Sequence, residues 1–324
     1  MTATIDVAGL VERARNGEPR AVARLISFVE DASPAMREVT AALAPFSGRA
    51  HVIGLTGAPG VGKSTSTSAL VGAFRARGLR VGVLAVDPSS PFSGGALLGD
   101  RVRMQEHATD SGVFIRSMAS RGHLGGLSWA TPQAIRVLDA AGFDIVLVET
   151  VGVGQSEVEV AGAADTAVVL LAPGMGDGVQ AAKAGILEIG DIFVVNKADR
   201  DGVEATLREL RHMITLGSGP RSGSADNPWK PPVLRTVASR GEGVADVVDA
   251  ISSHREWLGH SGQLAVRRHS RAQGEVEAIA FGIFRERIGD LSGDARLESL
   301  AQRVVDGVID PYAAADLLVA GLAP

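Results

Sequence analysis

The chain has 324 residues, 45% hydrophobic and 21% charged, a composition typical of a globular protein with one large domain or two smaller ones. Its net charge of −5 gives no sign of a protein that binds nucleic acid or a membrane surface. The chain has no cysteine, which excludes disulfides and thiolate metal sites, and it has no signal-peptide core or membrane-spanning apolar run, so we expect a cytoplasmic location.

The first segment, residues 5–44, predicts helices because apolar residues recur at helical spacing, and a break follows at 45–48. Short apolar runs then alternate with amphipathic segments. These runs are residues 51–56, 80–87, 143–150, 166–173, 191–199 and 232–239. Such alternation predicts an α/β fold with a mostly parallel central sheet and helices on both faces.

The later part of the chain changes character twice. Residues 217–232 are rich in Gly, Ser and Pro and predict an exposed loop, whereas the pattern from about residue 243 to the end is helical. We therefore expect three parts: an N-terminal helical extension over 1–48, an α/β core domain over 49–258 and a C-terminal helical arm over 259–324.

The strand at 51–56 runs directly into GAPGVGKS, residues 57–64, and then into a helical segment. This matches the phosphate-loop motif G-x-x-x-x-G-K-[ST] in its strand–loop–helix setting. Glycines allow backbone N–H groups to converge on phosphate oxygens, Lys63 is expected to reach the β- and γ-phosphates, and Ser64 is expected to ligate Mg²⁺. The expected nucleotide-binding residues here are Gly57, Ala58, Pro59, Gly60, Val61, Gly62, Lys63, Ser64 and Thr65.

The tetrapeptide NKAD, residues 196–199, follows an apolar strand and favours GTP over ATP. The Asp199 carboxylate can accept from guanine N1 and the exocyclic amine, which adenine lacks; Asn196 can bond the purine edge, and the stem of Lys197 can lie over the base. The loop at 236–244 is expected to complete base recognition through backbone groups of Ala238 and Ser239.

Three acids are candidates for the magnesium and water environment. Glu149 and Asp87 each end an apolar strand, and Asp100 lies in the segment that follows Asp87. For each of them the alternative is helix capping or a surface turn, as in the Asp-Pro-Ser-Ser sequence after Val86.

The sequence ETVG, residues 149–152, occupies the place where many GTPases have D-x-x-G, so Gly152 can offer its N–H to the γ-phosphate. Those GTPases that orient water with glutamine often place it directly after this glycine, but here the residue is Val153. Gln155 could act only if the loop folds back. We therefore expect slow hydrolysis that a partner protein accelerates.

Read together, GAPGVGKS, VDPSSPFSGGALLGDRVRM, ETVGVGQSE, APGMGDGVQAAKAGILEIGD and NKAD resemble the MeaB/ArgK family of GTPases, over about residues 10–320. The resemblance implies a P-loop GTPase core with a helical N-terminal extension and a C-terminal helical arm that forms a homodimer. It implies a GTP-hydrolysing chaperone that gates cofactor loading into adenosylcobalamin-dependent methylmalonyl-CoA mutase, or a related acyl-CoA mutase, and protects that enzyme.

The resemblance also assigns residues. Lys63 and Ser64 would serve the phosphates and Mg²⁺, and Asp87, Asp100 and Glu149 would form the acidic environment of the metal and water. Residues 174–183 look like an additional switch, in which Asp177 and Lys183 would signal to the mutase, although Lys183 equally suits a solvated helix face.

Three alternatives remain at this stage. An older family label implies an ATPase or kinase for lysine, arginine and ornithine transport, against which NKAD and the lack of a membrane segment argue. A metallochaperone normally needs a Cys/His cluster, whereas cysteine is absent and the seven histidines are scattered along the sequence. The amphipathic tail at 276–288, finally, could pack within its own chain instead of forming a dimer.

Overall fold

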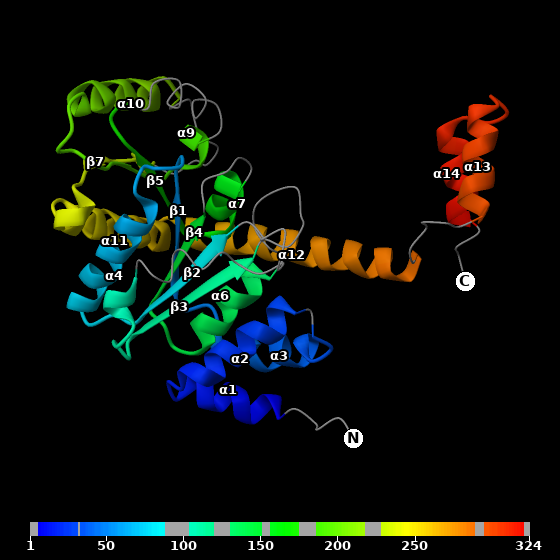
Figure 1. Cartoon of the computed structure of the whole chain (residues 1–324), viewed down its shortest axis with the longest axis horizontal. Helices are drawn as coiled ribbons and strands as arrows, with labels where there is room; N and C mark the ends of the chain where they lie inside the picture. The colour runs from blue at the N-terminus through cyan, green and yellow to red at the C-terminus, as the bar shows by residue number, and fades with distance from the viewer. Residues whose placement is uncertain are drawn as a thin grey trace. The chain divides into compact units, whose positions relative to one another are not determined.

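The computed structural model describes residues 6–31, 33–87, 104–119, 130–150, 156–174, 186–217, 228–288 and 295–320. The chain divides into two compact units, Met1–Val266 and Arg267–Pro324. The first unit contains a seven-stranded sheet with helices on both faces (Figure 1). Its strands are β1 (His51–Thr56), β2 (Val81–Asp87), β3 (Val113–Ala119), β4 (Ile145–Thr150), β5 (Thr166–Leu171), β6 (Ile192–Val195) and β7 (Val233–Arg235).

The sheet order is β3-β2-β4-β1-β5-β6-β7, and every pair of these neighbouring strands is parallel. The prediction of a mostly parallel sheet is therefore confirmed, but sequence reasoning missed β3. This edge strand reads VFIRSMA, and its first five residues are only partly buried, so it lacks the continuous apolar run of a strand covered on both faces.

The helices of the first unit lie before, between and after the strands. They are α1 (Val7–Arg15), α2 (Pro19–Glu30), α3 (Met36–Leu43), α4 (Lys63–Ala76), α6 (Thr131–Ala140), α7 (Ser156–Ala163), α9 (Ile186–Ile189), α10 (Val203–Gly217) and α11 (Val244–His260), with short 3₁₀ turns η1 (Ala44–Phe46), η2 (Gln105–His107) and η3 (Ala238–Arg240). The helix α12 (Gln263–Ile288) begins in the first unit and continues into the second.

The pleat of β4 divides the core between the two faces of the sheet, because successive side chains of a strand point to opposite faces. Ile145 and Leu147 belong to the hydrophobic cluster that includes α4 and α11, whereas Val146 and Val148 belong to the cluster that includes α6 and the N-terminal helices. This alternation directs the next residue, Glu149, toward α4.

The helix α4 is flanked on both sides by glycines with positive φ. Gly62 precedes it with φ +96°, and Gly78 follows it with φ +78°. At the end of the helix, the N–H of Gly78 donates to the carbonyl of Arg75 and the N–H of Leu79 to that of Phe74, which is the hydrogen-bond pattern of a Schellman motif. Both ends of the helix that carries Lys63 and Ser64 are therefore defined by local sequence.

The N-terminal helices α1–α3 pack on the sheet face that α6 covers. Leu25 and Ile26 of α2 are fully buried, in one hydrophobic cluster with Val137 and Leu138 of α6. The helices expected for residues 5–44 are thus present, and they share a core with the sheet. Whether residues 1–48 form a separate domain stays a prediction.

Two histidines that looked scattered in the sequence lie together at the opposite end of the strands from the phosphate loop. His51 Nε2 lies 2.7 Å from Thr166 Oγ1, and the same oxygen lies 2.8 Å from His254 Nδ1. His254 is fully buried against Trp229 and Trp257. These histidines join β1, β5 and α11, which is a structural role.

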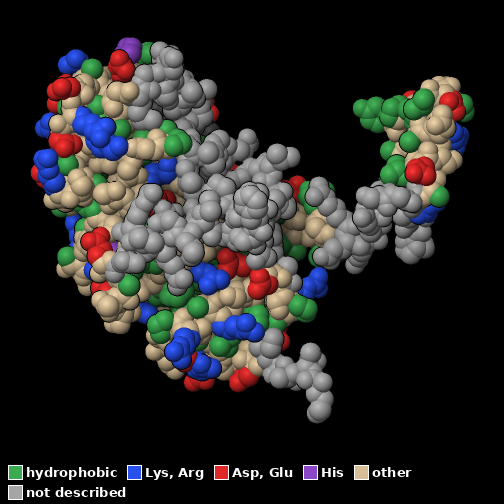
Figure 2. Space-filling model, in the orientation of Figure 1, with side chains coloured by type: hydrophobic (Ala, Val, Ile, Leu, Met, Phe, Trp, Pro, Cys, Tyr) green, Lys and Arg blue, Asp and Glu red, His purple; other side chains and the backbone are tan. Residues whose placement is uncertain are grey.

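The second unit contains the rest of α12 and the helices α13 (Ala295–Val305) and α14 (Pro311–Ala320), which pack on each other. Hydrophobic side chains lie at its surface, green in Figure 2. Val276 of α12 is 67% exposed and Tyr312 of α14 is 84% exposed, and no residue of α13 or α14 is buried. Among the described residues, no helix is long and apolar enough to cross a membrane.

Candidate functional site

The phosphate-loop motif forms the expected strand–loop–helix unit between β1 and α4. Gly57, Gly60 and Gly62 all have positive φ, which glycine adopts without steric cost. A Cβ on Gly57 would lie 2.2 Å from the carbonyl oxygen of Leu170 on β5, and one on Gly62 would lie 2.5 Å from Asn196 Nδ2. Both glycines are therefore needed for close approach to neighbouring segments as well as for their backbone conformation.

Lys63, at the first position of α4, is only 7% exposed and points back over the loop. Its ammonium donates to the carbonyl oxygens of Gly57 at 2.6 Å and Ala58 at 3.1 Å. A buried ammonium needs hydrogen-bond acceptors, and these carbonyls supply them. The positive charge is thus held at the loop that the motif assigns to phosphate binding.

Glu149 lies at the carboxyl end of β4, is 3% exposed and contacts two hydroxyls of α4. Ser64 Oγ lies 2.7 Å from its Oε1, and Thr67 Oγ1 lies 2.8 Å from its Oε2. Residues three apart on a helix share a face, which is why both hydroxyls reach the same carboxylate. Sequence reasoning singled out Glu149 and Ser64 but missed Thr67, although its spacing from Ser64 was a usable signal.

This group of oxygens fits the chemistry of Mg²⁺. The ion prefers hard oxygen ligands, and it is usually bound by one or two protein side chains together with phosphates and waters. The Ser64 hydroxyl and the Glu149 carboxylate are such groups, side by side at the end of the phosphate loop. Within the described ranges no group of three or more His, Asp or Glu side chains could hold a metal, so a dedicated all-protein cage is not found there.

The NKAD segment docks on the phosphate loop, from 135 residues further along the chain. Asn196 Nδ2 donates to the carbonyl of Val61 at 2.9 Å, and Lys197 Nζ donates to the carbonyl of Gly60 at 2.6 Å. Lys197 has φ +56°, the only positive value of a non-glycine residue in the described chain. The structure thus brings the two motifs into one site.

Asn196 also ties this pair of segments to the loop at 236–244. Its Oδ1 accepts from the backbone N–H of Ala238 at 3.1 Å and from the Thr236 hydroxyl at 3.1 Å. The side chain is 3% exposed, so these bonds form away from solvent. Sequence reasoning expected Asn196 at the purine edge; in this structure its amide links three backbone segments, a role that local sequence did not reveal.

Asp199 and Ser239, by contrast, face solvent. The Asp199 side chain is 38% exposed, and its Oδ2 lies 3.4 Å from Arg240 Nη2. Ser239 is exposed in the turn η3. A partly exposed carboxylate is accessible to a ligand, as recognition of guanine requires. Arg240, which is its neighbour here, was not singled out from the sequence.

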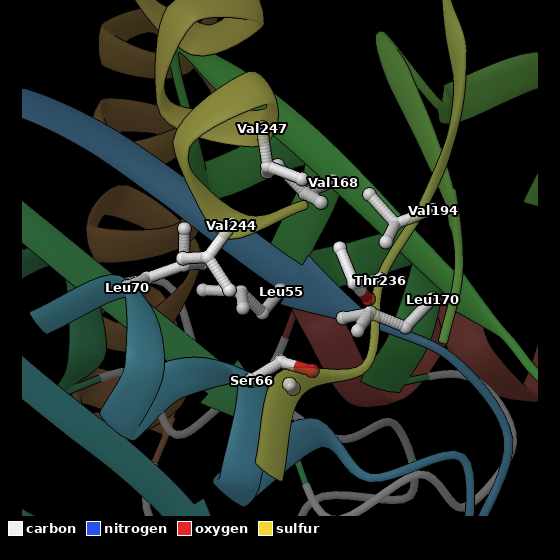
Figure 3. A pocket seen from close by; sticks show the side chains of 10 residues that line it. Leu55, Ser66, Leu70, Val168, Leu170, Val194, Thr236, Val244 and Val247 are labelled. Carbon is white, nitrogen blue, oxygen red and sulfur yellow. The ribbon is translucent and has the colours of Figure 1, made fainter. Parts of the chain in front are cut away.

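A small cavity lies behind the phosphate-loop helix, between α4, α11 and the strands (Figure 3). Its volume is about 10 Å³, enough for about one water molecule and far too small for a nucleotide. Ser66 and Thr236 present hydroxyls in its otherwise apolar wall, and Ser66 Oγ has no hydrogen-bond partner within the described structure. Successive residues of α4 thus have different surroundings: Thr67 contacts Glu149, and Ser66 faces this cavity.

Some predicted residues cannot be placed from the structure. Asp100, Gly152, Val153, Gln155, Asp177 and Lys183 lie outside the described residues. For Asp87 only the backbone is described, as the last residue of β2, in register with Ala119 of β3. Its side chain, and the alternative that it organises a turn, therefore stay at the level of prediction.

Comparisons with known proteins find a matching family and similar chains. Residues 22–290 match the family model of the methylmalonyl-CoA mutase-associated GTPase MeaB. A protein of Pyrococcus abyssi that is named as a GTPase is 48% identical over 310 residues, which cover 96% of this chain and 95% of that protein. The GTPase ArgK of Escherichia coli is 37% identical over 270 residues, covering 82% and 81%.

A solved structure, titled as a LAO/AO transport system kinase, superposes with a TM-score of 0.73 at 27% identity and covers 99% of both chains. The fold, the phosphate loop joined to NKAD, and relatives named as GTPases all lead to one assignment. The chain is a GTPase that belongs to the MeaB family of methylmalonyl-CoA mutase-associated GTPases.

Proposed function

We propose that this protein is a GTP-hydrolysing chaperone that gates cofactor loading into an adenosylcobalamin-dependent acyl-CoA mutase, methylmalonyl-CoA mutase or a relative, and protects that enzyme from inactivation. The observation that carries the nucleotide part is the docking of NKAD on the phosphate loop through Asn196 and Lys197. Two residues after Lys197, the Asp199 side chain is partly exposed and can accept hydrogen bonds from guanine. The name of the matched family supports the mutase as partner.

In this proposal the chain's own residues bind and orient the triphosphate. Backbone N–H groups of residues 60–65 hold the phosphates, and Lys63 stabilises negative charge on the β- and γ-phosphates. Ser64 would ligate Mg²⁺, and Glu149 would hold its water shell, with Asp87 and Asp100 as further candidates. When bound, the metal ion neutralises phosphate charge during transfer to water.

Slow hydrolysis without a partner is the expected behaviour of such a chaperone. Val153 follows Gly152 in the sequence, so no glutamine stands where many GTPases orient their water. We propose that a bound mutase accelerates hydrolysis by acting on the segments that contain Asp100 and Gly152. Asp177 and Lys183 would carry the signal toward the mutase.

The nucleotide part is tested by base selectivity. The wild-type protein should bind GTP and GDP far more tightly than ATP. In Asp199→Asn the side chain presents one donor and one acceptor in place of two acceptors, so binding should shift from guanosine to xanthosine nucleotides, whose C2 carbonyl can accept a hydrogen bond. Comparable affinities for GTP and ATP in the wild-type protein would reject guanine recognition and revive the transport-linked ATPase or kinase as the function.

The partner is tested separately, with purified methylmalonyl-CoA mutase. The two proteins should form a complex whose affinity differs between GDP and a non-hydrolysable GTP analogue, and the mutase should accelerate hydrolysis. A Lys63→Ala variant serves as the control that cannot respond to the nucleotide. If neither complex formation nor GTP turnover depends on the other component, the chaperone assignment fails while GTPase activity stands, and a metallochaperone role would be examined by metal transfer.

We further propose that the protein is a homodimer joined through the C-terminal arm. Apolar residues are spread over α12–α14 with their side chains exposed, namely Val276, Ile279, Phe281, Phe284, Leu297, Val305, Val308, Tyr312, Leu317 and Val319. So much exposed apolar surface is typical of an interaction site. Packing of these side chains within their own chain stays the alternative, and the sedimentation experiment described below separates the two.

A further inference from the structure

Thr67, a residue that the phosphate-loop motif does not include, contacts the carboxylate at the centre of the proposed magnesium site. Its Oγ1 lies 2.8 Å from Glu149 Oε2, while Ser64 Oγ lies 2.7 Å from Oε1. Thr67 is fully buried, and Glu149 is 3% exposed. The two hydroxyls, one helical turn apart, therefore hold one carboxylate oxygen each.

We propose that Thr67 is a positioning residue for magnesium binding, because it holds the Glu149 carboxylate in the orientation that serves the metal's water shell. This inference rests on the proposed role of Glu149. Hydrogen bonds from hydroxyls to carboxylates are stronger than those between neutral groups, and a buried carboxylate that loses a donor is costly to keep charged. Thr67 touches neither nucleotide nor metal in this proposal and acts through Glu149.

The two hydroxyls have different roles once magnesium binds. A hydroxyl has one proton and two lone pairs, so Ser64 can ligate the metal through oxygen and still donate its proton to Oε1. The orientation of the Ser64 hydroxyl then depends on both the metal and the carboxylate. Thr67 is not a metal ligand in this proposal, so its hydroxyl can donate to Oε2 whether or not the metal is bound. Thr67 is therefore the hydroxyl of this pair whose contact with Glu149 does not change when the metal binds.

A structural alternative exists for Thr67. Its Oγ1 also lies 3.0 Å from the carbonyl oxygen of Lys63, four residues earlier, which is a common bond of helical threonines. The single hydroxyl proton can go to one acceptor at a time. If it went to Lys63, removal of the hydroxyl would change the local stability of α4 but leave magnesium binding intact. The two possibilities therefore predict different responses to the metal.

The test is the magnesium dependence of nucleotide release, measured with fluorescent GDP in the full-length protein. Thr67→Val keeps the β-branched shape and removes the hydroxyl. Because a hydrogen bond to a charged group is lost, the Mg²⁺ concentration that half-maximally slows release should rise about tenfold. Affinity for GDP in EDTA should stay within about threefold of wild type, since the phosphate loop itself is unchanged.

Three variants complete the design. Thr131→Val is the matched control, because the Thr131 hydroxyl is fully buried on α6 and has no hydrogen-bond partner among the described residues. Its magnesium titration should match wild type. Glu149→Gln should require more magnesium, and adding Thr67→Val to it should cause no further change, because Thr67 acts through the charged carboxylate. An additive effect in the double variant would overturn the proposal.

Identical magnesium titrations of Thr67→Val and Thr131→Val would also overturn it. If Thr67→Val does not fold, the pair Thr67→Ser and Thr67→Ala differs by the hydroxyl alone, and equal magnesium midpoints in that pair have the same consequence. If wild type and Glu149→Gln respond identically to magnesium, the role of Glu149 fails and this inference fails with it. If Glu149→Gln is impaired and Thr67→Val is not, the inference about Thr67 alone is wrong.

Discussion

Asn196 should matter for folding as well as for nucleotide binding, because its side chain joins three segments that are far apart in sequence. In Asn196→Ala, the carbonyl of Val61, the hydroxyl of Thr236 and the N–H of Ala238 all lose their partner. At about 1 kcal/mol for each bond, the free energy of unfolding should fall by about 3 kcal/mol. That corresponds to a change of about a hundredfold in the unfolding equilibrium.

The contrasting variant is Asp199→Ala, three residues away in the same motif. Asp199 is partly exposed and its one described ion pair, with Arg240, is also exposed, so its removal should change the free energy of unfolding by less than about 0.5 kcal/mol. Both variants should lose GDP affinity, Asn196→Ala through disordered loops and Asp199→Ala through the lost base contact. Only Asn196→Ala should lose stability.

The assay is urea unfolding of the nucleotide-free protein, followed by tryptophan fluorescence. Trp229 and Trp257 lie in the unit that contains the site, and the third tryptophan, residue 129, belongs to the same stretch of sequence, so this signal reports on that unit. Calorimetric titration with GDP gives the second quantity. If Asn196→Ala unfolds at the same urea concentration as Asp199→Ala, the side chain acts on the base alone and our interpretation of its three hydrogen bonds is wrong.

Three further predictions follow from other parts of the chain. Gly57→Ala should abolish GDP binding, because the added Cβ would lie 2.2 Å from the carbonyl oxygen of Leu170. Gly60→Ala should retain weakened binding, because its Cβ would meet open space. Equal GDP affinities of the two variants would show that the close approach of Gly57 to Leu170 does not matter for binding. Hydrogen bonds from Arg75 and the Gly112 N–H lower the pKa of Asp110 below its ordinary 3.8, so the pair stabilises the fold above that pH and loses its effect as pH falls through the folded pKa. In Arg75→Gln the pKa of Asp110, measured by NMR titration of its carboxyl group, should therefore rise toward 3.8. An unchanged pKa of Asp110 would contradict the pairing with Arg75. Ile279→Glu combined with Phe284→Glu should convert the proposed dimer to monomer in sedimentation, and a wild-type protein that is monomeric at all concentrations would reject the arm as an interface.

Features that depend on residues close together in the chain could be predicted from the amino-acid sequence. The phosphate loop needs a glycine pattern, a lysine and a serine within eight positions, and its strand and helix adjoin it, so residues 51–76 could be predicted together. The buried strands were equally visible, because a strand covered on both faces must be apolar throughout. The edge strand β3 was missed because it is only partly buried and mixes polar with apolar residues.

Contacts between side chains far apart in the sequence could be identified only from the three-dimensional fold. Thr67 and Glu149 are 82 residues apart, and Asn196 and Val61 are 135 residues apart. No local pattern encodes these pairs, because they depend on which strands are neighbours in the sheet and on which face each side chain points to. The pleat of β4 turns Glu149 toward α4, and the order β4-β1-β5-β6 places the end of β6 where NKAD can reach the phosphate loop. The motifs could thus be found one by one in the chain, but their assembly into a single site required the sheet.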